Sequence, residues 1–208
     1  MKHIAESTVQ RLSLYLRFLE EFEAHGHQTI SSGELAAQGG TTSSQVRKDL
    51  SHFGSFGKRG LGYSVGALSA NLRKILGLGR QWRVIIIGAG KIGAALAQYE
   101  SFRARGFKVV GVYDNHPART GHTLGDVTVR DQRELEADIA KLEPDIALIA
   151  VPAQVAQQLV DRAVKAGVRA ILNFAPVPVH VPEHVVLRSV DMALELEVLS
   201  YALVNRDG

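Results

Sequence analysis

A glycine-rich turn between an apolar run and a helical stretch constrains the fold more than any other feature of this sequence. Residues 82–87 form a short apolar run of the kind that makes a buried β-strand. A G-x-G-x-x-G motif follows at once and comprises Gly88, Ala89, Gly90, Lys91, Ile92 and Gly93. In this setting the first glycine permits a tight turn, the second lets a pyrophosphate approach the backbone, and the third allows close helix–strand packing. The sequence therefore predicts a βαβ unit that binds a dinucleotide at the start of the helix.

An acidic residue follows the next predicted strand at the spacing expected for ribose recognition. This strand covers residues 107–113 and ends at Asp114, 21 residues after Gly93. A carboxylate there accepts a hydrogen bond from the adenosine ribose 2′-hydroxyl and disfavours a 2′-phosphate. The next two residues, Asn115 and His116, supply no arginine that would favour the phosphate. We therefore expect NADH or NAD+ as the ligand, in preference to the phosphorylated dinucleotides.

The remaining C-terminal sequence predicts a doubly wound parallel sheet. Helical stretches alternate with apolar runs: helices near 131–141 and 153–166, and strands over 145–151, 168–172 and 184–190. Ligands in such sheets bind beyond the carboxyl ends of the strands. The candidate pocket residues are therefore Val151, Pro152, Asn173 and Phe174.

No catalytic grouping accompanies the predicted nucleotide site. The strand ends carry no Ser/Tyr/Lys trio and no evident metal cluster, and His180 and His184 lie beyond the last crossover. A dehydrogenase needs a proton-transfer group beside the nicotinamide, so an NAD-dependent enzyme is the weaker alternative. A module for another nucleotide, such as the adenosine part of coenzyme A, also stays open, although Asp114 argues mildly against it.

Composition excludes several further kinds of chemistry. The chain has 208 residues and no cysteine, which rules out thiol nucleophiles, thiol redox switches, disulfides and cysteine-ligated metals. No apolar run approaches the ~18 residues of a membrane span, and the N-terminus lacks the apolar core of a signal peptide. We therefore expect a soluble cytoplasmic protein without a membrane or metal partner.

The first 80 residues differ from the rest in charge and in pattern. They carry a net charge of +4, against −1 for residues 81–208. A helix is predicted from Ser7 or Thr8 to Ala24, with a buried stripe at i, i+3 and i+4 spacing: Val9, Leu12, Leu16, Leu19 and Phe22. Ser31 and Glu34 form a capping box that opens a second, short helix, and a second box at 42–45 opens a third helix over about 43–53.

The third predicted helix has the character of a DNA-recognition helix. Its apolar residues Val46, Leu50 and Phe53 share one face, with Asp49 to the side. Its opposite face is basic and hydroxylic: Ser44, Arg47, Lys48 and Ser51. A short helix, a glycine turn and a helix of this kind form a helix-turn-helix, whose outer face can enter the major groove. We count Gln45, at the start of this helix, among the candidate DNA contacts.

A glycine-rich segment over 54–63 follows the third helix and reads as a β-hairpin or wing. Its tip carries Lys58 and Arg59, and an arginine on a thin loop suits a narrow minor groove. A three-helix bundle that makes only protein contacts is the alternative, because any surface helix needs a polar face.

The predicted last helix, over 191–205, is apolar nearly all round. A terminal helix of this kind needs cover on more than one side, and a partner subunit is the most economical cover. A dimer would also give the two-fold symmetry that helix-turn-helix proteins use.

Together these segments resemble the Rex family of redox-sensing transcriptional repressors. The resemblance is carried by five segments: 45–51, 53–54, 60–63, 88–93 and 173–176. It implies a homodimer that binds palindromic operator DNA, senses the NADH/NAD+ ratio and leaves the DNA when NADH binds. It also implies that the C-terminal helix is exchanged between subunits.

The resemblance further implies individual roles. Arg47, Lys48 and Ser51 match the recognition helix, and Lys58 and Arg59 match the wing. Tyr99 matches a tyrosine near the cofactor, and Asp191 an acid that pairs either with that tyrosine or with an arginine matched by Arg17. Met192 stands where some members have a phenylalanine near the nicotinamide.

The expected fold class is therefore α/β, in three parts. Residues 1–78 are expected to form a winged-helix DNA-binding domain. Residues 79–190 are expected to form a Rossmann NAD(H)-binding domain, and residues 191–208 a dimerisation helix.

Overall fold

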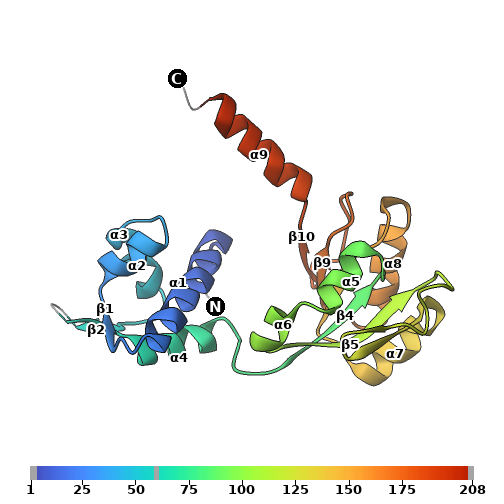
Figure 1. Ribbon diagram of the computed structural model, residues 1–208, viewed down its shortest axis with the longest axis horizontal. Coiled ribbons are helices and arrows are strands. Elements are labelled where there is room, and N and C mark those ends of the chain that lie inside the picture. The colour runs from blue at the N-terminus through green and yellow to red at the C-terminus, as the bar shows by residue number, and fades with distance from the viewer. Residues whose placement is uncertain (1–3, 59–60, 206–208) are drawn as a thin grey trace. The chain divides into compact units, whose positions relative to one another are not determined.

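The computed structural model describes residues 4–58 and 61–205, except for the side chain of Lys58. The chain divides into two compact units, residues 1–80 and 81–208. Figure 1 shows a helical unit with a small sheet and an α/β unit with a larger one.

The N-terminal unit combines helices with a small antiparallel sheet. Its helices are α1 (Glu6–Ala24), α2 (Ser32–Gln38), α3 (Ser43–Ser51) and α4 (Val65–Ile75). Its strands, in the spatial order β1-β3-β2, are β1 (Thr29–Ile30), β3 (Gly62–Ser64) and β2 (Gly57–Lys58). The β2–β3 hairpin after α3 confirms the predicted winged-helix arrangement.

The sequence analysis did not predict α4, which follows the hairpin directly. Ser64 caps it by accepting a hydrogen bond from the Ala67 amide, and Leu68 and Leu72 are buried on its inner side. The capping serine and the i, i+4 spacing of these leucines are visible in the sequence. The helical pattern is hard to recognise in the sequence because the glycine-rich hairpin ends immediately before it.

The buried stripe of α1 is rotated from the predicted one. Thr8 and Tyr15 are buried together with Leu12, Leu16 and Leu19, whereas Val9 is exposed. The prediction for Val9 is therefore wrong. The buried face of α1 includes Tyr15 because the Tyr15 hydroxyl donates a hydrogen bond to the buried Asp49 carboxylate.

Only the first of the two predicted capping boxes is complete. The Glu34 amide donates to Ser31 Oγ at 3.1 Å, and the Ser31 amide donates to Glu34 Oε2 at 2.7 Å. Thr42 Oγ1 accepts from the Gln45 amide at 3.1 Å, but the Gln45 side chain binds Asp49 and makes no return contact. The helix that Thr42 caps ends at Ser51, two residues before the predicted end.

The C-terminal unit is built on a seven-stranded sheet with the order β10-β9-β8-β4-β5-β7-β6. The strands are β4 (Trp82–Ile87), β5 (Phe107–Asp114), β6 (Thr123–Leu124), β7 (Val127–Asp131), β8 (Ile146–Ile149), β9 (Ala170–Asn173) and β10 (Val186–Ser189). All pairs are parallel except the β6–β7 hairpin. This order is that of a Rossmann sheet with a reversal beside β4, which confirms the predicted fold class.

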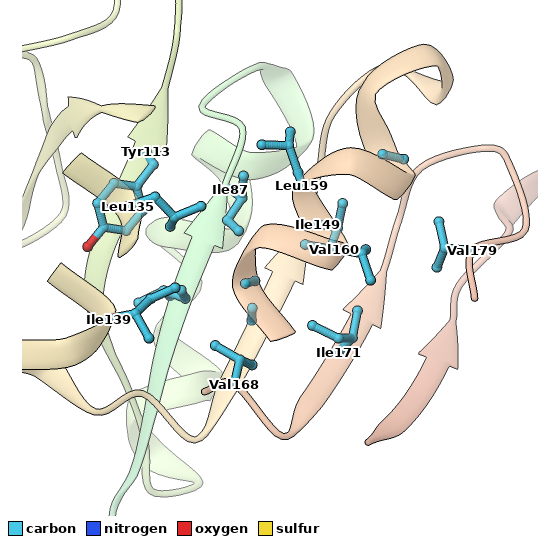
Figure 2. Packing of buried hydrophobic residues seen from close by; sticks show 14 of the residues in the cluster. Ile87, Tyr113, Leu135, Ile139, Ile149, Leu159, Val160, Val168, Ile171 and Val179 are labelled. Atoms are coloured by element: carbon cyan, nitrogen blue, oxygen red, sulfur yellow. The ribbon is translucent and has the colours of Figure 1, made fainter. Parts of the chain in front are cut away.

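Helices cover both faces of this sheet. They are α5 (Lys91–Ala97), α6 (Glu100–Ala104), α7 (Leu135–Leu142) and α8 (Ala153–Lys165). On one face, Leu135 of α7 and Leu159 of α8 pack with Ile87 and Ile149 in a core that Figure 2 shows at close range. On the other face, Leu96 of α5 and Phe102 of α6 pack near Ile86.

The predicted helix near 131–141 begins later than expected. Residues up to Asp131 belong to β7, and a short 3-10 turn (Gln132–Glu134) precedes α7. Asp131 Oδ1 accepts a hydrogen bond from the Arg133 amide and so starts the turn. The last helix, α9 (Met192–Val204), agrees with the prediction, and every one of its residues is exposed in the single chain.

Candidate functional site

The glycine-rich loop joins β4 to α5, and two of its three glycines, Gly88 and Gly93, occupy positions where a larger residue would clash. Gly88 has φ +101°, and a Cβ there would overlap the carbonyl of Ala150. A Cβ on Gly93 would overlap the Gly88 carbonyl oxygen. Gly90 is different, because a Cβ there would meet no atom within 4 Å. The loop is thus tight where it packs on the protein and open at its middle glycine, as phosphate binding requires.

The strand register brings the other candidate residues to the same edge of the sheet. Ile87, the last residue of β4, is paired with Tyr113 on β5 and with Ile149 on β8. Ile149 is in turn paired with Asn173 on β9, so all four residues lie at the same level of the sheet. The residues that follow these strand ends are consequently neighbours, and they include Gly88, Asp114, Val151 and Phe174. Pro152 is the N-cap residue of α8, while Lys91 and Ile92 are exposed in the first turn of α5.

Asn173 lies at this edge with its side chain fully buried. Its Nδ2 donates to the carbonyls of Ala175 and Val177, at 3.3 and 2.9 Å, and its Oδ1 accepts from the Ala175 amide at 3.0 Å. The amide group is therefore used to shape the loop after β9. Phe174 is half-buried against the sheet face that carries α5.

Asp114 is buried, and its carboxylate binds the glycine-rich loop directly. Its Oδ2 accepts from the Ala89 amide at 2.7 Å, and its Oδ1 accepts from the His116 amide at 2.8 Å. Arg119 adds an ion pair, with Nη1 3.1 Å from Oδ2. Burial raises the pKa of Asp114, but these hydrogen bonds outweigh burial and lower its pKa. The group is therefore an anion at neutral pH.

Arg119 is a functional candidate that the sequence analysis missed. The two residues after Asp114 include no arginine, and Arg119 lies five residues after Asp114. A hydrogen-bonded turn, with the Arg119 amide donating to the His116 carbonyl at 2.9 Å, brings it back to the carboxylate. Arg119 therefore places a positive charge beside the predicted ribose position.

The exposed face of α3 agrees with the predicted arrangement. Ser44, Arg47, Lys48 and Ser51 are all exposed, while Val46 and Leu50 are buried. One Arg47 guanidinium nitrogen donates to Ser32 Oγ at 3.0 Å. Two cations and two hydroxyls therefore stand together on the outer side of this helix.

Asp49 is fully buried and does not border the basic face. Arg11 holds its carboxylate with two bonds, from Nε to Oδ2 at 2.6 Å and from Nη2 to Oδ1 at 2.7 Å. Tyr15 donates to Oδ2 at 3.0 Å, and Gln45 Nε2 donates to Oδ1 at 2.8 Å. This network fastens α3 to α1 and removes the acidic charge from the exposed side of α3. The sequence alone does not indicate this network, because Tyr15 and Arg11 are 34 and 38 residues away from Asp49.

The hairpin that follows α3 pairs Gly57 with Tyr63 and Lys58 with Gly62. Gly62 has φ +77°, and a Cβ there would meet the Ile30 carbonyl oxygen at 2.5 Å, so only glycine fits between the strands. Arg59 and the side chain of Lys58, which the sequence predicts at the tip, lie outside the described residues.

The residues that the family resemblance connects to switching lie on separate elements. Tyr99 precedes α6, is exposed, and stacks edge-on with Phe102 at a centroid distance of 5.1 Å. Asp191 caps α9, because its Oδ1 accepts from the Ala193 amide at 2.9 Å. Met192 is exposed at the start of α9, and Arg17 is exposed on α1.

The Asp49 network predicts that the N-terminal unit loses stability in acid. Burial raises the pKa of Asp49, but its three hydrogen-bond partners outweigh burial and hold the pKa below its ordinary value of 3.8. A lowered pKa stabilises the folded state above the unfolded pKa, and this contribution is lost as the pH falls through the folded value. We expect thermal melts between pH 6 and pH 3 to fall more steeply for the wild type than for Asp49→Asn. Parallel pH profiles would contradict the assignment.

Residues 4–58 and 61–205 contain neither a candidate metal cluster nor a candidate membrane-spanning helix. No cluster of three or more His, Asp or Glu side chains there could hold a metal ion. Within the same residues, no helix has the length and apolarity needed to cross a membrane.

Two family descriptions match the two units. "Putative DNA-binding protein N-terminus" matches residues 3–51, and "CoA binding domain" matches residues 79–177. Among solved structures, RSP in complex with β-NAD+ and operator DNA is 40% identical with a TM-score of 0.94, covering 100% of this chain and 95% of RSP. RSP in complex with β-NADH is 39% identical with a TM-score of 0.90, covering 100% and 97%.

Curated relatives match over nearly the full chain. The redox-sensing transcriptional repressor Rex of Pelotomaculum thermopropionicum is 48% identical, covering 99% of this chain and 96% of the relative. The Rex repressor of Streptomyces coelicolor is 46% identical, covering 99% and 80%. The chain therefore belongs to the Rex family of redox-sensing transcriptional repressors.

Proposed function

We propose that this chain represses transcription as a homodimer on palindromic operator DNA and leaves the DNA when it binds NADH. Its DNA occupancy would then report the NADH/NAD+ ratio of the cytoplasm, and the nucleotide would be a reversible ligand that is not consumed. The observation that carries the proposal is the similarity, over the whole chain, to a repressor solved with NAD+ and operator DNA and also with NADH. The proposal assigns DNA binding to residues 1–78, NAD(H) binding to 79–190 and dimerisation to 191–208.

The basic face of α3 supports the DNA-binding half of the proposal. Arg47, Lys48, Ser44 and Ser51 would enter the major groove, where guanidinium groups read guanine and hydroxyls bind phosphates. Lys58 and Arg59 of the hairpin would reach the neighbouring minor groove. Gln45 would act mainly through Asp49, because its side chain is already bonded there.

The edge of the large sheet supports the ligand-binding half. The loop from Gly88 to Gly93 would hold the pyrophosphate, since Gly90 is open to approach. Asp114 would accept from the adenosine ribose, as an anion fixed by the loop. Val151, Pro152, Phe174 and Met192 would surround the nicotinamide end, with Asn173 shaping the loop beneath it.

The exposed helix α9 supports the proposed homodimer. Large apolar residues lie all round it and are more than half exposed in the single chain: Met192, Leu194, Leu196, Val198, Leu199, Tyr201, Leu203 and Val204. Burying this surface against a second copy is strongly favourable, and exchange of α9 between subunits would achieve it. Asp191 would then pair with either Tyr99 or Arg17, and its partner would change with the ligand state. NADH could shift this equilibrium only by its difference in affinity for the two states.

A mobility-shift assay on operator DNA tests the proposal. NADH, NAD+, NADPH and coenzyme A are added in turn at equal concentrations. We expect NADH to release the protein at concentrations where NAD+ and coenzyme A do not. Release by coenzyme A with no response to NADH would identify a different nucleotide sensor, and turnover of NADH with a carbonyl substrate would identify an enzyme.

Substitutions in α3 and in the hairpin should weaken DNA binding in different ways. Arg47→Ala removes a base-reading group, so we expect a loss of about 1–3 kcal/mol together with relaxed sequence preference. Lys58→Ala removes a contact to the DNA phosphate backbone, so we expect weaker binding to all DNA sequences alike. Titration of operator and scrambled duplexes at one salt concentration separates the two effects. Unchanged binding by both variants would show that the groove assignment is wrong.

A further inference from the structure

Two positively charged side chains lie next to each other at the amino ends of two neighbouring strands. Arg83 of β4 is paired in register with Lys108 of β5, and neighbouring strands of a sheet are about 4.8 Å apart. Ile85 and Val110, each two residues further along its strand, pack in the core that α7 and α8 cover. Side chains alternate between the two faces along a strand, so both cations project on this same face. Like charges at neighbouring positions repel each other, which destabilises the sheet.

No group in the described part of the chain, residues 4–58 and 61–205, offsets these two charges. Within it, neither the Arg83 guanidinium nor the Lys108 ammonium forms an ion pair or a hydrogen bond. Arg83 Nε is buried there without an acceptor. Asp145 accepts a hydrogen bond from the main-chain amide of Arg83 at 2.8 Å, not from its guanidinium. A buried donor without an acceptor costs free energy, so the arrangement suits an anion that arrives from outside.

Both side chains line an open cavity of about 1230 Å³. The cavity forms because β5 and β7 pair at their carboxyl ends, over 112–114 and 129–131, and diverge toward their amino ends. Arg130 of β7 lies on the wall as a third cation, with Nη1 2.6 Å from Asp138 Oδ2 and a side chain that is 40% exposed. We call the part of the cavity lined by Arg83, Lys108 and Arg130 the basic hollow.

The acids on the cavity wall leave the basic hollow positive. Asp126 is paired with Arg103, and these two charges offset each other. Glu100 belongs to α6, which covers the opposite face of the sheet from Arg83 and Lys108. A ligand at the basic hollow would therefore meet cations first.

The chemistry of the basic hollow suits phosphate groups. A guanidinium donates two parallel hydrogen bonds to two oxygens of one phosphate, and an ammonium adds a compact positive charge beside it. Three cations within one hollow fit an anion of several charges better than a single carboxylate. The cavity continues to Phe102 and Phe107, so it has room for a ligand larger than its phosphates.

We propose that the basic hollow binds the phosphate groups of a small ligand, of the size and charge of a diphosphate. Arg83 and Lys108 hold the phosphate oxygens, and Arg130 adds its charge while it stays paired with Asp138. The site differs from the dinucleotide edge, because Arg83 lies at the amino end of β4 and Gly88 follows its carboxyl end. The inference does not depend on the proposed function.

Calorimetric titration of the full-length protein with inorganic pyrophosphate at constant ionic strength tests the site. Titrations are run with and without saturating NADH, because the loop from Gly88 to Gly93 is a second candidate for phosphates. We expect binding in both conditions. Arg83→Gln and Lys108→Gln should each weaken it by about tenfold, the size of one charge-assisted hydrogen bond. Lys165→Gln removes an exposed cation at the end of α8 and should leave the affinity unchanged.

Thermal unfolding without ligand separates binding from folding. Both variants relieve the repulsion between Arg83 and Lys108, so at low salt they should melt no lower than the wild type. If Arg83→Gln unfolds because its Nε is buried, Lys108→Gln decides the question, since Lys108 is exposed. A second series with ADP identifies the source of the phosphates. Tighter binding of ADP than of pyrophosphate supports a nucleotide ligand, and equal affinities support a site that contacts phosphate alone.

Three results would overturn the inference. The first is a wild-type protein that binds no pyrophosphate at millimolar concentrations. The second is an unchanged affinity in both Arg83→Gln and Lys108→Gln. The third is complete loss of pyrophosphate binding when NADH is present, because the phosphates would then occupy the glycine-rich loop instead.

Discussion

Gly93→Ala is expected to abolish NADH binding and to destabilise the C-terminal unit by about 3 kcal/mol, the upper part of the range for overpacking. The added Cβ would overlap the Gly88 carbonyl oxygen and touch Ile86 Cγ2 at 3.4 Å. Both neighbours belong to the rigid junction of β4 and its loop, so α5 would have to move away from the sheet. Titration of NADH fluorescence, together with thermal unfolding, measures the two effects.

Gly90→Ala is the matched control for this change. A Cβ on Gly90 meets no atom within 4 Å, and the residue has φ −68°, which suits any amino acid. We expect this variant to unfold like the wild type while binding NADH more weakly, because the methyl group occupies the approach to the backbone. A Gly93→Ala variant as stable as Gly90→Ala, with normal NADH binding, would contradict the account of the loop.

Asp49→Ala is expected to be the most damaging single change in the N-terminal unit. It leaves Arg11, Tyr15 and Gln45 without their shared acceptor in a buried position. Breaking a buried pair costs about 3–5 kcal/mol, and we expect about 3 because the Arg11 side chain is 27% exposed. Operator affinity should fall as well, since the network holds α3 on α1. Denaturant unfolding of the full chain, followed with operator titration, measures both losses.

Two further variants separate the network from a general effect of losing an acid. Asp126→Ala removes an acid from an exposed ion pair with Arg103 and should cost less than about 1 kcal/mol. Replacing Arg11 by Met together with Asp49→Ala should recover part of the stability, because no unpaired guanidinium remains. If Asp49→Ala were no more harmful than Asp126→Ala, the network would not be what positions α3.

Local motifs of the fold could be predicted from the sequence. The strand at 82–87, the turn from Gly88 to Gly93 and the capping box at Ser31 each depend on residues that lie within a few positions of one another. The basic face of α3 could also be predicted, because helical spacing alone determines it. These features follow from backbone conformation and periodicity, which a single sequence carries.

Features that depend on polar contacts, either between distant residues or within irregular turns, could not be predicted. Tyr15 replaces Val9 in the core because of a hydrogen bond to Asp49, 34 residues away. Arg119 reaches Asp114 only through a turn whose shape the sequence does not specify. Asn173 points inward because the carbonyls of Ala175 and Val177 need donors. In each case a polar partner, rather than hydrophobic periodicity, decides where the side chain lies.

The central claim is that NADH and operator DNA oppose each other on one chain, and a reciprocal binding experiment tests it most directly. NADH affinity is measured by fluorescence in the absence and in the presence of saturating operator duplex at one salt concentration. We expect operator to weaken NADH binding by the same factor by which NADH weakens operator binding, about 5–150-fold for a typical coupling. Equal NADH affinities with and without operator would contradict it.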